Sequence, residues 1–164
     1  LNALLSARFD RVDAAPAVVV CGPQGIGKSA VCARVALQAR LSGWTVVETA
    51  RLTPVEVIAT IELSPDRPLL LVVEAADEYQ PADWQQLAAA AGARTMLMAT
   101  RQARPTGDVT TVELGPLSRD AVEQLIEVTV GVARGAAAPE VVDAVLAGSG
   151  GVPALVTYAW GIWA

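Results

Sequence analysis

Residues 22–29 constrain the fold of this chain more than any other feature of its sequence. They read Gly-Pro-Gln-Gly-Ile-Gly-Lys-Ser and fit the pattern Gly-x-x-x-x-Gly-Lys-Ser/Thr at every fixed position. The segment follows the apolar run 17–21 directly and precedes a stretch of helical character that begins at residue 28. A strand, a glycine-rich loop and a helix in this order favour an α/β fold with a phosphate-binding loop.

Each residue type in this loop suits a phosphate ligand. Glycines let the backbone curl until successive N–H groups converge on an anion, and the helix that follows adds the positive end of its dipole. Lys28 can reach β- and γ-phosphates, and Ser29 can bind Mg²⁺. The residues predicted to contact the nucleotide here are Gly22, Pro23, Gln24, Gly25, Ile26, Gly27, Lys28, Ser29 and Ala30.

The lysine of this loop is the only lysine in the chain. Lysine and arginine together number 12, and all but Lys28 are arginine. A preference for arginine that spares a single lysine indicates that the compact ammonium is needed at that position. The alternative, a glycine-rich turn that fits the pattern by chance, leaves this lysine unexplained.

Composition excludes several other kinds of chemistry. The chain has no histidine, and its cysteines, Cys21 and Cys32, lie in apolar stretches without metal-ligand spacing, which excludes a zinc site and a histidine-based triad. A net charge of −5 argues against direct capture of nucleic acid. No apolar run approaches the roughly 18 residues of a membrane span, so we expect no membrane association and a cytoplasmic location.

The apolar runs alternate with helical stretches. These runs are continuous, and charged residues make up only 18% of the chain, which is typical of strands covered on both faces. The pattern predicts a three-layer α/β fold with a five-stranded parallel sheet. The expected strands are 17–21, 44–48, 69–74, 95–100 and 110–114, and the expected helices of this part are 28–41, 54–63 and 83–91.

The character of the sequence changes near residue 115. Three helices, 119–130, 139–147 and 153 to the end, are expected there with no further strand. We therefore predict a nucleotide-binding core over 1–115 and a small all-helical unit over 116–164. The chain begins at Leu1 and ends on an apolar segment, which favours a fragment whose neighbouring domain is missing.

A second group of candidate residues follows the apolar run 69–74. Glu74 at its tip is expected to hold Mg²⁺ together with Ser29, and Asp77 or Glu78 to polarise an attacking water. Aspartate is the usual residue at the position of Glu74, and the additional methylene predicts slow or weak hydrolysis. The alternative for Asp77 and Glu78 is a solvated acidic loop.

Several segments together resemble the STAND class of P-loop ATPases, which includes the NB-ARC and NACHT proteins and the LuxR-type and AfsR-like bacterial regulators. The resemblance is carried by Glu-Ala-Ala-Asp-Glu at 74–78, Met-Leu-Met-Ala-Thr-Arg at 96–101, Leu-Gly-Pro-Leu-Ser at 114–118 and Gly-Gly-Val-Pro-Ala-Leu at 150–155. It implies that Arg101 senses the γ-phosphate and that Pro153 packs near the adenine. It also implies a base contact near Arg8 and Phe9.

The resemblance implies a regulatory switch that binds ATP or ADP with Mg²⁺ and hydrolyses ATP slowly, as in a bacterial transcription regulator. Its implied partners are a winged-helix domain and repeats of the same chain, and a nucleotide-dependent homo-oligomer. A P-loop kinase for small molecules, an AAA+-like motor and an inert nucleotide-binding scaffold remain as alternatives.

Overall fold

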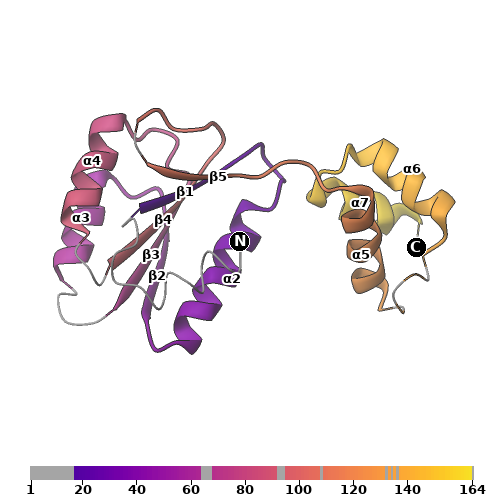
Figure 1. Ribbon diagram of the computed structural model, residues 1–164, viewed down its shortest axis with the longest axis horizontal. Helices are drawn as coiled ribbons and strands as arrows, with labels where there is room; N and C mark the ends of the chain where they lie inside the picture. The colour runs from indigo at the N-terminus through magenta and orange to yellow at the C-terminus, as the bar shows by residue number, and fades with distance from the viewer. Residues whose placement is uncertain are drawn as a thin grey trace. The chain divides into compact units, whose positions relative to one another are not determined.

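A computed structural model of the chain describes residues 17–63, 68–91, 95–107, 109–131, 133, 135 and 137–163. The base contact expected near Arg8 and Phe9 lies outside these residues. The strands are β1 Ala17–Cys21, β2 Thr45–Ala50, β3 Leu69–Glu74, β4 Thr95–Arg101 and β5 Thr110–Glu113. The helices are α2 Lys28–Leu41, α3 Pro54–Glu62, α4 Pro81–Ala90, α5 Arg119–Val130, α6 Pro139–Ser149 and α7 Pro153–Trp163 (Figure 1).

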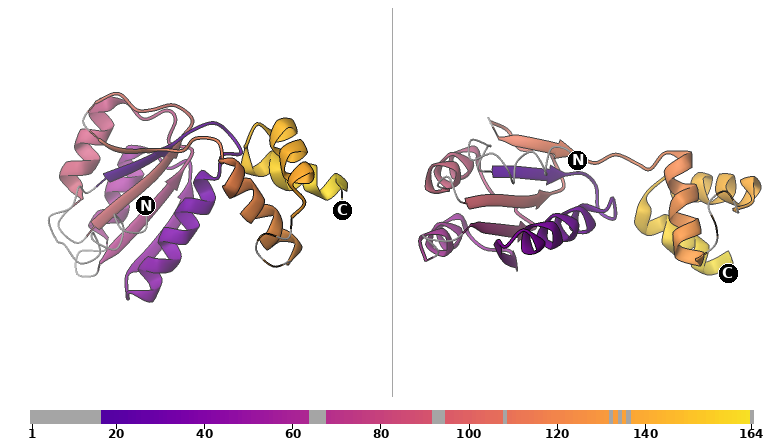
Figure 2. Two further views of the ribbon diagram at one scale, coloured as in Figure 1. Left: turned by 45° about the vertical axis from the view of Figure 1, so that its right-hand side comes forward. Right: turned by 60° about the horizontal axis from the view of Figure 1, so that its bottom comes forward.

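The five strands form one parallel sheet in the order β2-β3-β4-β1-β5. Helix α2 contacts one face of the sheet, and α3 and α4 lie together on the opposite side (Figure 2). This confirms the predicted three-layer α/β fold. Strands β1 and β3 are buried along nearly their whole length, as their continuous apolar runs predict.

The core follows from the alternation of side chains along the strands. Val19, Leu71 and Val73 belong to the cluster on the α3 and α4 face, which also holds Trp84 and Leu87 of α4. The intervening residues of β1 and β3 point to the face that α2 covers with four buried side chains, Cys32, Val35, Ala36 and Ala39. Both faces of the sheet are therefore packed, and functional groups are left to the strand ends.

Several element boundaries differ by one or two residues from those expected, and two of these differences have a physical reason. Strand β2 runs to Ala50 rather than residue 48, because its register with β3 continues to the pair Ala50 and Glu74. Helix α4 begins at Pro81 rather than Asp83. Asp83 instead sits in the first turn, where its Oδ2 accepts a hydrogen bond of 2.7 Å from the N–H of Gln80 before the helix.

By its contacts the chain divides into two compact units. One contains the sheet with α2, α3 and α4. The other contains α5, α6 and α7 together with Pro23–Gly27, the tip of the glycine-rich loop. The helical unit has its own apolar core, formed by Val122, Ile126, Val142, Val145 and Val156. Among the described helices of either unit, none has the length and apolar character needed to cross a membrane.

Candidate phosphate-binding site

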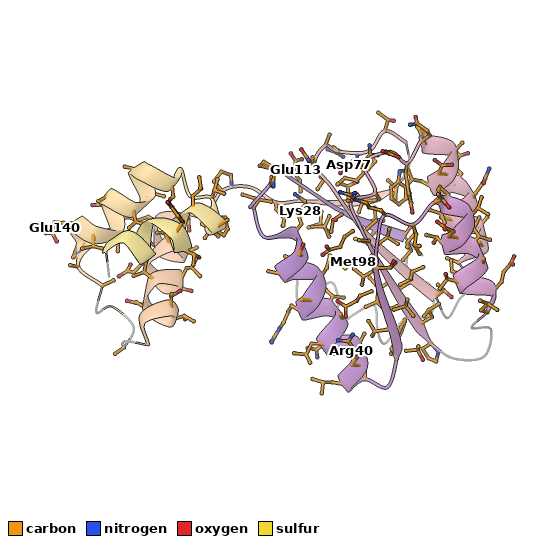
Figure 3. The ribbon with its side chains drawn as sticks, turned by 180° about the vertical axis from the view of Figure 1, so that it is seen from behind. Lys28, Arg40, Asp77, Met98, Glu113 and Glu140 are labelled. Carbon is orange, nitrogen blue, oxygen red and sulfur yellow. The ribbon has the colours of Figure 1, made fainter. Side chains whose placement is uncertain are left out.

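The candidate residues of the sheet unit gather at one edge of the sheet. In a parallel sheet the carboxyl ends of all strands meet at the same edge, where ligands of open α/β sheets bind. The glycine-rich loop leaves β1 there, Glu74 ends β3 and Arg101 ends β4. Figure 3 shows Lys28 and Asp77 at this end of the sheet and Arg40 toward the opposite end.

Two glycines give the loop a backbone conformation that other residues rarely adopt. Gly25 and Gly27 have φ angles of 80° and 98°, which side chains with a Cβ rarely adopt. The N–H of Gly22 points to the carbonyl oxygens of Arg101 and Gln102 at 3.2 Å each, so the start of the loop is tied to the end of β4. The Nζ of Lys28 donates to the carbonyl oxygen of Gly22 at 2.7 Å. The ammonium of Lys28 thus lies at the first residue of the loop.

The helix that follows the loop is prepared for an anion. Helices α3, α4, α5 and α6 each carry an acidic residue in the first turn, which complements the positive end of the helix dipole. Helix α7 has none, and neither has α2, which begins with Lys28 and Ser29 instead. Its exposed N–H groups are therefore available to an anionic ligand such as a phosphate.

The expected Mg²⁺ residues lie on neighbouring elements. Ser29 is exposed in the first turn of α2, and Glu74 is partly buried at the tip of β3. The pKa of the Cys32 thiol, one turn after Ser29, is raised to about 12 by burial and further by the negative charges of Glu74 and Glu48. Helix α2, which carries Ser29, contacts β3, which ends at Glu74. In the described part of the chain, no three acidic or cysteine side chains cluster as metal ligands. These residues fit a Mg²⁺ ion that takes its other ligands from phosphates and water.

The burial of both cysteines gives a testable expectation. Cys21 and Cys32 are 1% and 2% exposed. Burial raises the pKa of both thiols, with Glu113 adding to the effect at Cys21. Because the thiolate is the nucleophile, both thiols should resist iodoacetamide in the folded protein at pH 8 and react once the protein is unfolded in guanidinium chloride. Mass spectrometry would measure this, and rapid labelling of Cys32 in the folded state would contradict its burial between α2 and the sheet.

Arg101 makes contacts that its sequence context does not reveal. Its guanidinium donates to the carbonyl oxygens of Asp77 at 2.9 Å and Tyr79 at 3.3 Å. The side chain thus binds the segment after β3, while the backbone of Arg101 adjoins the start of the glycine-rich loop.

The acidic pair after β3 divides into one bound and one free carboxylate. Oδ1 of Asp77 accepts a hydrogen bond of 2.7 Å from the N–H of Gln102, which fastens the segment to the end of β4. The carboxylate of Glu78 has no hydrogen bond or ion pair to the described residues, and it is exposed. Glu78 is therefore the better candidate to orient a water, and Asp77 contributes to holding the segment.

Thr100 is a site residue that the sequence indicated only as part of a motif. Its Oγ1 accepts a hydrogen bond of 3.0 Å from the N–H of Ala75, and its carbonyl oxygen accepts one of 2.9 Å from the N–H of Ala76. The side chain is 4% exposed. Thr100 therefore fixes the backbone immediately after Glu74, and a buried threonine at the end of an apolar strand is the signal that could have identified it.

Pro153 begins α7 and lies in the helical unit. Within that unit, the N–H of Ala154 donates to the carbonyl oxygen of Gly25 at 3.2 Å. A Cβ added to Gly25 would lie 3.2 Å from Cβ of Ala154 and 3.3 Å from Cγ1 of Val152. The loop tip therefore packs closely on the first turn of α7, and its carbonyl satisfies an N–H that the helix itself leaves unpaired.

Solved structures resemble this chain closely enough to define the fold. DnaA of Aquifex aeolicus bound to AMPPCP matches with a TM-score of 0.63 and 11% identity over 94% of this chain and 57% of that chain. The RuvB Holliday junction branch migration motor of Thermotoga maritima matches with a TM-score of 0.64 and 17% identity over 94% of this chain and 56% of that one. The chain has the P-loop NTPase fold.

A P-loop NTPase fold places the glycine-rich loop where the geometry above has it, between β1 and α2 at the carboxyl edge of the sheet. The chain spans less than three fifths of the length of these DnaA and RuvB chains. Neither the protein-family models nor the curated proteins contain a match to the sequence.

Proposed function

We propose that this chain is the nucleotide-binding part of a regulatory switch that binds ATP or ADP with Mg²⁺ and hydrolyses ATP slowly. The observation that carries the proposal is the loop itself. Residues 22–29 follow the phosphate-loop pattern, Gly25 and Gly27 have positive φ, Lys28 donates to the carbonyl oxygen of Gly22, and α2 begins without an acidic residue. The DnaA relative of the same fold binds an ATP analogue, AMPPCP, which supports an adenine nucleotide as the ligand.

Each residue of the site has a proposed part. The loop residues, from Gly22 to Ala30, hold the phosphates through backbone N–H groups and the ammonium of Lys28. Ser29 and Glu74 hold Mg²⁺, which offsets the charge of the β- and γ-phosphates. Glu78 orients the water, and Thr100 and Asp77 keep the segment that carries it in place. The longer side chain of Glu74 makes the metal site less favourable, in agreement with a switch rather than a rapid catalyst.

Arg101 has the features of a group that changes partners. Its Nε is buried and has no hydrogen-bond partner among the described residues. A buried donor without a partner costs about 1–3 kcal/mol. A γ-phosphate would offer the guanidinium a stronger, charged acceptor than the carbonyl oxygens of Asp77 and Tyr79. ATP and ADP would then differ in where Arg101 binds, which is the difference that a nucleotide switch requires.

The contact between the loop tip and α7 offers a route for this difference to reach the helical unit. Gly25 packs on Val152 and Ala154, so a change of the loop on binding phosphate bears on the start of α7. In the proposed switch Pro153 adjoins the nucleotide, the core covers residues 1–115 and the helical unit covers 116–164. A winged-helix domain and repeats of the same chain would follow, and the ATP form would assemble into homo-oligomers.

An AAA+-like motor is the second candidate, because DnaA and RuvB have the same fold as this chain and RuvB is a branch migration motor. The two proposals differ in rate. We expect ADP to bind tightly in calorimetric titration and ATP turnover, measured by phosphate release, to be slower than about one per minute, against about one to a thousand per second for typical enzymes. Turnover in that faster range would favour the motor, and absence of nucleotide binding would contradict both.

Glu74→Asp is the variant that links the slow rate to its proposed cause. The shorter carboxylate restores the residue usual at this position, so Mg²⁺-dependent turnover should rise, whereas Glu74→Gln should remove it. Glu48→Gln serves as a control, because Glu48 also acts on Cys32 but lies within β2. Equal turnover in the parent, Glu74→Asp and Glu74→Gln proteins would move the metal role away from Glu74.

A further inference from the structure

A second cavity opens on the carboxyl edge of the sheet, apart from the glycine-rich loop. Its volume is about 610 Å³, within the range of small-molecule sites in proteins. No residue of the loop lines it. Its walls come from the segments that follow β2, β3 and β4 and from the first turn of α4, all within the sheet unit. The lining residues are Arg51, Leu52, Thr53, Pro54, Ala75, Asp77, Glu78, Tyr79, Asp83 and Gln102.

The rim of this cavity is held in a strained backbone conformation. Arg51 and Ala75 have φ angles of 61° and 58°, and they are the non-glycine residues with positive φ in the described part of the chain. They follow the paired residues Ala50 and Glu74, so they face each other at the end of the β2–β3 ladder. Each costs about 1–2 kcal/mol relative to an ordinary conformation. The turn made at each of these residues leads the chain away from the sheet edge and leaves space for the cavity.

The floor and wall of the cavity are rigid. The hydroxyl of Tyr79 donates to the carbonyl oxygen of Leu52, which joins the segment after β3 to the segment after β2. The ring of Tyr79 packs on Trp84 with centroids 5.1 Å apart. Thr53 is fixed by a reciprocal pair of hydrogen bonds with Glu56 at the start of α3. The cavity is therefore formed in advance of any ligand, which lowers the entropic cost of binding.

The cavity is lined by more negative than positive side chains, and only some of them make hydrogen bonds within the protein. Arg51 is the single cationic side chain among the lining residues, against the carboxylates of Asp77, Glu78 and Asp83. Asp77 and Asp83 each already accept one backbone N–H. The side chains of Arg51 and Glu78 have no hydrogen bond or ion pair to the described residues. Among the described residues that line the cavity, one cation therefore has no partner within the protein, and negative charge is in excess.

We propose that this cavity binds a small molecule that carries a carboxylate at one end and an amine or guanidinium at the other, in the class of the basic amino acids. The carboxylate pairs with the guanidinium of Arg51, and the cationic end lies among Glu78, Asp77 and Asp83. Leu52, Pro54 and Tyr79 provide apolar surface for the methylene chain between them. A ligand that carries a positive charge besides its carboxylate complements three carboxylates and one guanidinium better than a simple anion does.

This inference does not depend on phosphate binding by the glycine-rich loop, because no residue of the loop lines the cavity, although Asp77 and Glu78 have a role in both proposals. Where both hold, the ligand contacts Asp77 and Tyr79, whose carbonyl oxygens bind Arg101. The occupied cavity would then act on the same segment as the nucleotide.

The test uses L-arginine and two analogues in calorimetric titration. Agmatine lacks the carboxylate of arginine, and L-citrulline lacks its side-chain charge. L-arginine should bind about tenfold tighter than either, the effect of removing one charge-assisted hydrogen bond. No saturable binding of L-arginine or of L-lysine would overturn the proposal. Equal affinity for all three compounds would overturn the assignment of the two ends.

Two variants test which residue binds each end of the ligand. Arg51→Asn removes the cation but keeps a residue tolerant of positive φ, so L-arginine affinity should fall about tenfold while agmatine affinity stays unchanged. Glu78→Gln should lower the affinities for L-arginine and agmatine alike and leave the affinity for L-citrulline unchanged. If neither variant alters L-arginine affinity, the ligand lies elsewhere and the proposal fails.

Two further variants serve as controls. Arg34→Asn removes an exposed arginine of α2, which does not line the cavity, and should leave L-arginine binding unchanged. Lys28→Ala should also retain L-arginine binding even though it loses nucleotide. Loss of arginine binding in Lys28→Ala, with thermal unfolding unchanged, would show that arginine occupies the phosphate loop and would overturn the separate site. Failure of the nucleotide proposal alone would leave the arginine results intact.

Discussion

Replacing Lys28 with alanine is expected to weaken ATP and ADP binding by about 100-fold or more, the loss of a charged hydrogen bond worth up to about 3 kcal/mol together with a neutralised phosphate charge. The fold should persist, because the side chain is only partly buried and its hydrogen bond to the carbonyl oxygen of Gly22 lies after the end of β1. Isothermal titration calorimetry would measure the affinities, and circular dichroism would report the fold.

Two companion variants sharpen this result. Lys28→Arg keeps the charge but replaces a compact ammonium with a planar fork, and it should also lose most of the affinity. Arg40→Ala removes a cation from the last turn of the same helix, where it pairs with Glu48 at 2.5 Å, and should change nucleotide affinity little. Undiminished ATP and ADP binding by Lys28→Ala would remove the phosphate-loop assignment altogether.

The fold was predictable because local sequence patterns mark most of its strands and helices. Strands β1 and β3 are unbroken apolar runs, and Thr53 with Glu56 and Pro54 marks the start of α3 as a capping box with proline in the first turn. The burial of both faces follows from the same runs. Boundaries that depend on pairing, such as the end of β2 at Ala50, were set by β3 and not by the residues of β2 themselves.

The contacts within the candidate site were less predictable, because they join segments far apart in the chain. The sequence indicated Glu74, Asp77 and Arg101 as functional, but nothing local showed that Arg101 donates to carbonyl oxygens 22 and 24 residues before it. Arg51 and Ala75 carry no turn signal, since neither is glycine or asparagine, and yet both adopt positive φ. Both residues follow the last pair of the β2–β3 ladder, and this pairing cannot be read from the local sequence, so the cavity was not predictable.

Asp77 illustrates how tertiary contacts change the interpretation of a motif. From the sequence, Asp77 and Glu78 were equivalent candidates for activating a water. In the structure, the Asp77 carboxylate accepts the Gln102 N–H while its carbonyl accepts from Arg101, so this residue links the ends of β3 and β4. A residue bound at both its side chain and its backbone is suited to positioning, which leaves Glu78 with the freer carboxylate.

Glycine in the Gly-Val-Pro segment carries the second large expected effect. Gly151 has a φ of 75°, and a Cβ there would lie 2.6 Å from the carbonyl oxygen and 3.1 Å from the nitrogen of Leu117. The same residue accepts a backbone hydrogen bond of 2.7 Å from the N–H of Leu117. Both contacts are with backbone, which cannot move aside as a flexible side chain would. The segment 114–118 and the start of α7 are therefore held together through the absence of a side chain at this position.

Gly151→Ala should destabilise the helical unit by about 2–4 kcal/mol, combining overpacking against backbone with the cost of positive φ. Gly150→Ala is the matched control, because Gly150 also has positive φ, 57°, but a Cβ there would meet nothing within 4 Å. Its cost should be only about 1 kcal/mol. Native-state hydrogen exchange of the amides in α5, α6 and α7 would measure both losses separately from the sheet unit. Equal losses in the two variants would mean that the close approach of Gly151 to Leu117 contributes nothing, and that both glycines serve only the turn before α7.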